Sequence, residues 1–255
     1  MHLQPLPALS DNYIWTLADG EGNAVVVDPG ESAPVLAAAE QGLRPVAILL
    51  THHHPDHIGG VPALLDRWPG LPVIAPADDR IPSATRQVGA GEQVTVRGWD
   101  FEVHAVPGHT ASHIAFHGHG LLFCGDTLFS LGCGRLFEGS PAQMLDSLDR
   151  LAALPGETLV CCGHEYTQSN AAFARVVDPD NPVLRRRCEE VDAKRQAGEP
   201  TLPSQLADER ACNPFLRVDE VAVQAAVAAQ GDTDAGGDRI ATFAALRRWK
   251  DHFRA

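Results

Sequence analysis

Four short apolar runs in this chain each end in a glycine-containing turn that carries a histidine or an aspartate. They cover residues 46–50, 101–106, 121–124 and 158–162, and the turns that follow read THHHPDHIGG, PGHT, GDT and GHEY. Such runs are typical of buried β-strands, and strands of one sheet system can bring their terminal turns to a common rim. The pattern predicts a ligand site built from these four turns.

The first turn places four histidines and an aspartate within six positions. Burying such side chains costs free energy unless a partner offsets the loss of water. In extended backbone His52 and His54 point to one face, which suits a chelating pair, while His53 points to the other and is expected to be structural. Asp56 and His57 follow a tight turn and can face the opposite side. We expect a metal site here.

The number of donors indicates two ions. A catalytic zinc usually takes three protein ligands, so five imidazoles and two carboxylates are too many for one ion. Divided between two ions, they give three ligands each and one bridging carboxylate, and the residual charge of about +2 favours hydroxide at neutral pH. The candidate ligands are His52, His54, Asp56, His57, His109, Asp126 and His164.

The secondary-structure pattern of the sequence changes near residue 166. Before it, β-rich runs alternate with Gly- and Pro-rich turns, with helical patterns at 61–68 and 141–153; after it, helical patterns dominate, joined by loops at 178–182 and 197–203. The sequence predicts an α/β domain at 1–166 and a smaller helical domain at 167–255.

Composition limits the partners. A net charge of −13, with no basic run that would overcome it, argues against nucleic acid as a partner. The N-terminal residues lack the features of a signal peptide, and no apolar run is long enough to cross a bilayer. Six cysteines without a C-x-x-C pair indicate reduced, buried thiols. We therefore expect a cytoplasmic protein with no membrane partner, and a monomer.

The motifs T-H-x-H-x-D-H, P-G-H-T, G-D-T and G-H resemble those of the metallo-β-lactamase superfamily. A closer resemblance, to the hydroxyacylglutathione hydrolases (glyoxalase II), rests on DNYIW, VDPG, LFCGDTLFSLGCGRLFEG, CGHEYT, NPFLRV and LRRWKDHF, and covers essentially the whole chain. It implies an αββα sandwich capped by a helical part. The implied activity is hydrolysis of S-(2-hydroxyacyl)glutathione, usually S-lactoylglutathione, to glutathione and D-lactate in methylglyoxal detoxification.

The resemblance also implies roles for individual residues. One ion would bind His52, His54 and His109, the other Asp56, His57 and His164, with Asp126 bridging. Zinc is the expected metal, with iron or manganese as alternatives. Asp28 is interpreted either as a turn residue or as a group that orients a metal-binding imidazole. His113 could act in the same way or could serve packing.

The glutathione carboxylate would be held by Arg247 and Lys250 in a helix at 238–253. Leu246, Trp249 and Phe253 recur there at helical spacing and should pack inward. Further substrate contacts are implied for Arg135, Phe137 and Tyr166, although some relatives carry Lys and Tyr in place of the first two. We expect no catalytic protein side chain, because a metal-bridging hydroxide would attack the thioester and a thiol of pKa about 8.5 leaves as an anion.

Two other functions stay open. The same scaffold could carry a mononuclear iron persulfide dioxygenase or a lactonase, although a dioxygenase usually lacks a full second site. A non-enzymatic metal-binding protein would be signalled by the loss of a ligand, and all seven candidates are present.

Overall fold

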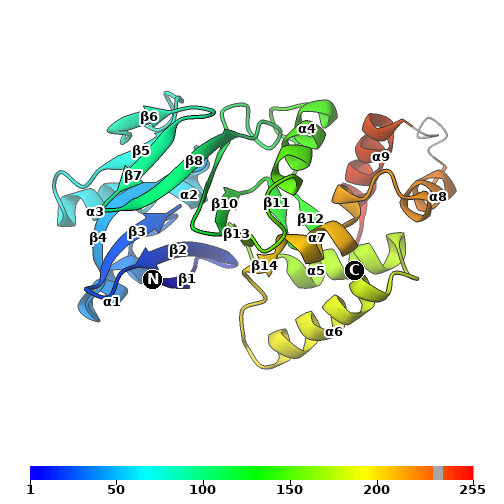
Figure 1. Cartoon of the computed structure of the whole chain (residues 1–255), viewed down its shortest axis with the longest axis horizontal. Helices are drawn as coiled ribbons and strands as arrows, with labels where there is room; N and C mark the ends of the chain where they lie inside the picture. Colours follow the sequence, from blue (N-terminus) through cyan, green and yellow to red (C-terminus); the bar gives the residue numbers. More distant parts are fainter. Residues whose placement is uncertain (232–237, 255) are drawn as a thin grey trace. The chain divides into compact units, whose positions relative to one another are not determined.

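The computed structural model describes residues 1–231 and 238–254 and forms two compact units, whose elements are labelled in Figure 1. The first unit comprises Met1–Ala105, Ser112–Gly125 and Cys161–His164. The second comprises Val106–Ala111, Asp126–Val160 and Glu165–Ala255. The units do not follow chain order, so the expected domains at 1–166 and 167–255 stay a prediction. Residues 232–237 and 255 of the expected helical domain lie outside the described residues.

The first unit contains a six-stranded sheet in the order β1-β2-β3-β4-β5-β6. Neighbours are antiparallel from β1 to β3 and parallel from β3 to β6. The sequence interpretation missed β1, β2 and β6. The run HLQPLPA contains two prolines, which are tolerated because β1 is an edge strand. The strands are β1 (His2–Ala8), β2 (Asn12–Ala18), β3 (Asn23–Val27), β4 (Arg44–Leu49), β5 (Val73–Pro76) and β6 (Arg86–Val88).

In the second sheet of this unit β7, β8, β9 and β10 pair antiparallel in this order, and the Cys161–Cys162 end of β13 (Leu159–Cys162) lies beside β10. The other end of β13 belongs to the second unit and pairs there with β14 (Ser204–Gln205). The remaining strands are β7 (Gln93–Val96), β8 (Trp99–Ala105), β9 (Ile114–Gly118) and β10 (Leu121–Gly125).

Hydrophobic packing explains the layering of the first unit. One face of the first sheet, including Val26 and Ile48, packs against α1 (Ala33–Glu40) and α3 (Val61–Arg67) in one buried cluster. On the other face, the Trp15 indole Nε1 donates to the Cys162 carbonyl of the second sheet at 2.9 Å. Strands β3 and β4 are therefore covered on both faces, and their terminal turns start from a rigid support.

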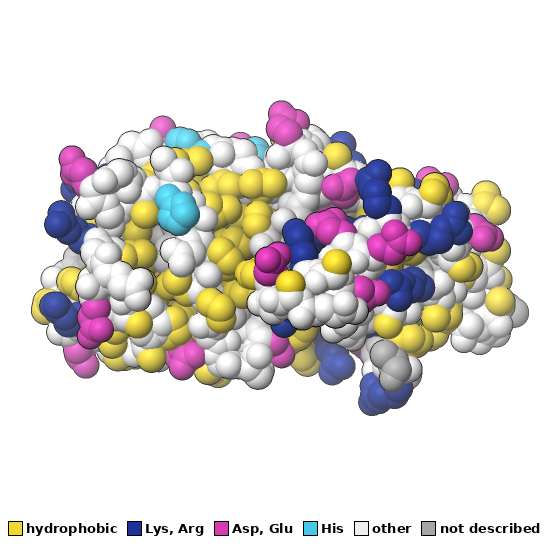
Figure 2. Space-filling view, turned by 90° about the horizontal axis from the view of Figure 1, so that it is seen from below, with side chains coloured by type: hydrophobic (Ala, Val, Ile, Leu, Met, Phe, Trp, Pro, Cys, Tyr) yellow, Lys and Arg dark blue, Asp and Glu magenta, His cyan; other side chains and the backbone are white. Residues whose placement is uncertain are grey.

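The second unit is mainly helical. An aromatic cluster of Phe173, Phe215, Phe243 and Trp249 joins its helices. On the face that Figure 2 shows, Lys and Arg side chains stand among Asp and Glu, and Lys194 pairs with Glu190 at 2.9 Å. The elements are α4 (Pro141–Ala152), α5 (Thr167–Val177), α6 (Pro182–Gln196), α7 (Leu206–Cys212), η1 (Pro214–Leu216), α8 (Val221–Ala229) and α9 (Arg239–His252).

The predicted helices and loops are confirmed. Helices α3 and α4 match the patterns at 61–68 and 141–153, and α9 matches the pattern at 238–253. Asp238 is the N-cap of α9, since its side chain accepts a hydrogen bond from the Ala241 amide. The six cysteines are free and buried, as expected.

The second unit contains a tight β-hairpin that is hydrogen-bonded to residues of its C-terminal helical part. Strands β11 (Leu128–Phe129) and β12 (Gly132–Cys133) are joined by two residues, one of which, Leu131, has φ of 58°. The Leu131 amide donates to the Glu209 carboxylate at 2.8 Å, and the Asn213 side-chain amide donates to the Phe129 and Gly132 carbonyls at 3.0 Å. These contacts hold a backbone conformation that a leucine rarely adopts.

Candidate metal centre

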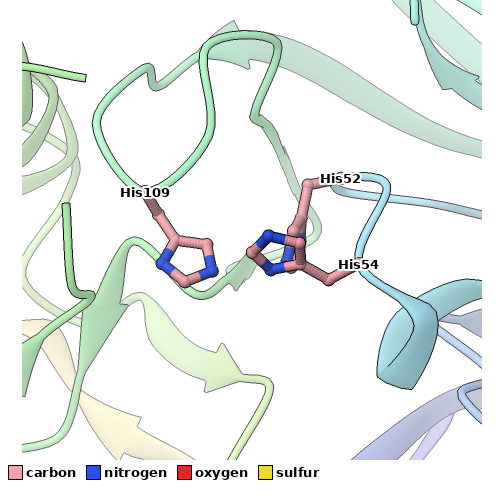
Figure 3. Close-up of side chains that lie close together, drawn as sticks. All are labelled: His52, His54 and His109. Atoms are coloured by element: carbon pink, nitrogen blue, oxygen red, sulfur yellow. The ribbon is translucent and has the colours of Figure 1, made fainter. Parts of the chain in front are cut away.

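The histidine cluster begins with His52, three residues after the end of β4. His54 is extended and precedes α2 (Pro55–Ile58), whose first residue is a proline with a preset helical φ. The rings of His52 and His54 lie against each other in Figure 3, with Nε2 of His52 3.1 Å from Nδ1 of His54. The neighbouring His53 instead directs Nδ1 toward Asp78, at 3.5 Å. The pairing of His52 with His54 is as expected, whereas the ring of His53 also lies 4.8 Å from that of His54.

A second donor group lies in the same unit and consists of Asp56, His57 and His164. One ligand atom from each lies within 4.8 Å of the others, a spacing that could hold a metal ion. Oδ2 of Asp56 lies 3.5 Å from Nε2 of His57 and 3.3 Å from Nε2 of His164. The short helix α2 and the second residue after β13 thus supply the group.

The two remaining ligand candidates belong to the second unit. Nε2 of His109, the other histidine drawn in Figure 3, lies 3.5 Å from Oδ2 of Asp126. Nδ1 of His109 donates to the Arg135 carbonyl at 2.9 Å. A Cβ at Gly134 would lie only 1.9 Å from the Asp126 carbonyl oxygen, so only glycine permits this approach.

Hydrogen bonds set the tautomers of three imidazoles. Nδ1 of His57 donates to Asp28 at 3.0 Å, and Nδ1 of His164 donates to Asp11 at 2.8 Å. Nδ1 of His109 likewise donates, to the Arg135 carbonyl. Because these acceptors need a proton on Nδ1, the lone pair is left on Nε2, the form in which imidazole binds a metal. The donor set therefore fits divalent ions.

Asp28 serves two histidines. Its Oδ2 accepts from Nδ1 of His57 at 3.0 Å and from the Thr51 hydroxyl at 2.6 Å, while Oδ1 accepts from the Thr51 amide at 2.8 Å. The Thr51 oxygen lies 3.0 Å from Nδ1 of His52, which must donate because the hydroxyl proton is already used. Asp28 is also a turn residue with φ of 50°. Both interpretations of this residue therefore hold.

Sequence reasoning gave no role to Asp11 and Asn12, although it quoted the motif that contains them. Asn12 is 6% exposed and donates from Nδ2 to Oδ2 of Asp56 at 3.1 Å. The available signal was a polar Asp-Asn pair at the start of a buried strand. His113, whose role was left open, stacks on His52 with ring centroids 4.5 Å apart.

The five predicted substrate contacts all lie in the second unit, but in different environments. The Arg135 and Phe137 side chains are 62% and 63% exposed, and the Phe137 ring lies 5.2 Å from that of His109. Tyr166 is partly exposed beside Phe129. Arg135 is therefore a cation exposed to solvent, nine residues after the ligand candidate Asp126.

Arg247 is only 5% exposed, whereas a grip on a substrate carboxylate suggested an accessible side chain. It donates from one terminal nitrogen to the Cys133 carbonyl at 2.8 Å and from the other to Asp251 at 3.0 Å. Its guanidinium also lies over the Phe215 ring, at 5.1 Å. These contacts join α9 to β12, so the side chain has a packing function in addition to any contact with a ligand.

Lys250 lies over the rings of Phe173 and Phe253 and donates to the Ser169 carbonyl at 3.1 Å. Burial lowers the pKa of its ammonium group to about 8, and the neighbouring charges of Arg247 and Arg135 add to this effect. The group therefore changes charge only slightly above neutral pH.

Two family models match consecutive parts of the chain. Residues 13–164 match the model of the metallo-β-lactamase superfamily, and residues 165–253 match the C-terminus of hydroxyacylglutathione hydrolase. A hydroxyacylglutathione hydrolase of Xanthomonas campestris pv. campestris (strain B100) is 59% identical over 256 residues, with both chains fully covered.

Two solved structures extend the comparison. ETHE1 from Myxococcus xanthus superposes with a TM-score of 0.67 at 26% identity, covering 100% of this chain and 92% of that one. The structure of TTHA1623 in a di-iron-bound form gives a TM-score of 0.53 at 34% identity. This match covers 64% of this chain and 92% of that one. With a metallo-β-lactamase domain and its characteristic helical C-terminal part, this chain belongs to the hydroxyacylglutathione hydrolase family of the metallo-β-lactamase superfamily.

Proposed function

We propose that this chain hydrolyses S-(2-hydroxyacyl)glutathione, with S-lactoylglutathione as its main substrate, to glutathione and a 2-hydroxy acid, D-lactate in this case. This is the second step of methylglyoxal detoxification. The observation that carries the proposal is the set of histidines whose Nδ1 atoms are each tied to an acceptor, which leaves Nε2 for a metal. Membership of the family supplies the substrate class.

The proposed centre holds two divalent ions, zinc being expected and iron or manganese being alternatives. His52, His54 and His109 would hold one ion, and Asp56, His57 and His164 the other, with Asp126 bridging. Support comes from the short donor distances within each unit. Nitrogen and oxygen donors suit all three metals, so the ligands alone do not select one.

The bound ions would supply Lewis acidity toward a water molecule and toward the thioester carbonyl. The water would give up its protons to solvent as its oxygen bonds to the carbonyl carbon, the C–S bond would break, and the sulfur would leave with the electron pair as glutathione thiolate beside the carboxylate of the 2-hydroxy acid. That thiolate is stable enough to leave without a proton, since a thiol has a pKa of about 8.5. The chain therefore needs no general acid, and its ligands and their hydrogen-bond acceptors act by orientation.

Substrate recognition would rest on local cations. The chain carries −13 overall, so attraction of an anionic substrate must come from a short-range patch. In the second unit Asp251 lies 3.6 Å from Arg135 and 3.0 Å from Arg247. The charges of all three residues affect the pKa of Lys250. We assign the glutathione carboxylate to this group, with Phe137 and Tyr166 as further contacts.

We also propose that the protein acts as a cytoplasmic monomer. Among the described residues, no helix combines the length and apolar character needed to cross a membrane. The six buried free thiols suit a reducing compartment.

The test is release of free thiol from S-lactoylglutathione, measured together with metal content per chain. Turnover by protein that holds two ions is expected. Absence of thiol release from such protein would contradict the proposal, and oxygen consumption with a persulfide substrate would instead support a dioxygenase.

A further inference from the structure

The turn between β1 and β2 lies against the end of β13. The turn consists of Leu9, Ser10 and Asp11, and Leu9 has φ of 50°. The Tyr13 amide donates to the Gly163 carbonyl at 2.8 Å, and Asn12 forms an isolated β-bridge with His164. Backbone contacts therefore fix this turn beside a candidate ligand, and all of these residues belong to the first unit.

The Asp11 carboxylate makes a direct contact with that ligand. Oδ1 of Asp11 accepts from Nδ1 of His164 at 2.8 Å, while 39% of the Asp11 side chain is exposed to solvent. A carboxylate in this position raises the basicity of the imidazole and fixes the ring orientation. Its partial exposure lowers the cost of keeping it ionised.

The buried Asn12 acts on a different ligand. From Nδ2 it donates to both the backbone carbonyl and Oδ2 of Asp56, at 3.2 and 3.1 Å. The Asp56 side chain is 38% exposed, so solvent contact alone would leave its rotamer weakly defined. The side-chain NH2 group of Asn12 thus contacts both the backbone and the side chain of Asp56.

Each of the three members of the Asp56 group has its own main hydrogen-bond partner, and Nδ2 of Asn12 also lies 3.5 Å from Nε2 of His164, within the same group. Asn12 holds Asp56, Asp11 holds His164, and Asp28 holds His57. Asp28 also reaches His52 through Thr51, whereas the contacts of Asp11 and Asn12 described above are confined to the Asp56 group.

We propose that Asp11 and Asn12 are positioning residues that stabilise one of the two ions, the one held by Asp56, His57 and His164. The inference rests on the proposed function for the existence of two ions. The β1–β2 turn fixes the orientation of two ligands of this ion. Loss of its side-chain contacts weakens the binding of that ion alone.

The experiment follows zinc release from the two-zinc protein into a chromogenic chelator. Removing a hydrogen-bond partner of a metal ligand weakens metal binding by about 10–100-fold, so Asp11→Ala and Asn12→Ala should each release one zinc at least about tenfold faster. The second zinc should leave at the unmodified rate. Asp11→Asn, which keeps an acceptor oxygen, should release zinc at a rate closer to that of the unmodified protein.

Two controls make the result specific. Ser10→Ala changes an exposed residue of the same turn and should leave both release rates unchanged. Asp28→Ala should accelerate release of both ions, because Asp28 serves histidines of both sets. Circular dichroism would confirm that each variant is folded.

Equal acceleration of both ions in Asp11→Ala, or acceleration of neither, overturns the inference. An unmodified chain that holds only one zinc overturns it as well. A two-zinc protein that releases no thiol contradicts the proposed reaction, while its zinc release rates still decide the role of the turn.

Discussion

Nδ1 of His57 donates to Oδ2 of Asp28 at 3.0 Å, and this carboxylate receives three hydrogen bonds on its two oxygens. Because every partner donates, an amide cannot replace the carboxylate: in either orientation its NH2 group would face a donor. Asp28 is therefore important for its charge and not only for its turn conformation.

Asp28→Asn is predicted to weaken zinc binding by about 10–100-fold while leaving the turn intact, because Asn also tolerates positive φ. Competition with a chelator measures the zinc affinity. Ser10→Ala is a suitable surface control. Unchanged affinity would show that the tautomer of His57 does not depend on Asp28.

Asp126→Ala is predicted to weaken binding of both ions and abolish turnover, because the shared negative ligand is removed. Metal analysis after dialysis and the thiol-release assay measure these two effects. Near-normal turnover by a variant that retains two ions would rule out a bridging role for Asp126.

Arg247→Met and Lys250→Met are predicted to have different effects. Arg247 is buried and donates to Cys133 and Asp251, so its loss should lower the free energy of unfolding by about 1–3 kcal/mol. Lys250→Met should instead raise KM for the glutathione thioester with kcat little changed, because its ligand lies far from the bond that breaks.

Urea unfolding and steady-state kinetics with a glutathione thioester and a thioester lacking the peptide distinguish the two effects. The preference for glutathione should fall in Lys250→Met. If it is unchanged in both variants, glutathione is recognised elsewhere on the chain.

The pH dependence of KM follows from Lys250. Its pKa is lowered to about 8, so the ammonium group is charged below this pH and neutral above it. Affinity for an anionic substrate should therefore fall, and KM rise, as the pH increases through 8. Burial raises the pKa of the neighbouring Cys133 thiol to about 11, so this thiol does not titrate in the same range.

The matched control is Lys250→Met, in which KM should stay nearly constant between pH 7 and about 9. A rise of the same size in that variant would assign the pH effect to another group. Measurements at fixed ionic strength remove the effect of salt on the charged patch.

Local pattern was enough to find the ligand candidates, because each follows a strand end and their spacing is visible in the sequence. The partners of the ligands were harder to find. Asp11 contacts His164 across 153 positions, and no local rule connects a turn near the N-terminus with the end of β13. Hydrogen bonds between distant segments depend on the order of strands in the sheets, which the sequence did not give.

Burial of charge was also difficult to predict. A helical pattern placed Arg247 beside Lys250 on one face of α9, and periodicity does not show what covers that face. The Cys133 carbonyl and the Phe215 ring, which lie more than 100 and about 30 positions away, determine that Arg247 is buried. Likewise β1 was missed because its prolines argue against a strand unless the strand lies at an edge.

The β11–β12 hairpin has a consequence for how this chain can be divided. Severing the chain after residue 166 would remove Glu209 and Asn213, leaving the Leu131 amide and two carbonyls of the hairpin without partners. Arg135, whose carbonyl orients His109, lies two residues beyond β12. Recombination between relatives at that boundary would therefore succeed only when the incoming helices bring a carboxylate and an amide that fit the hairpin already present.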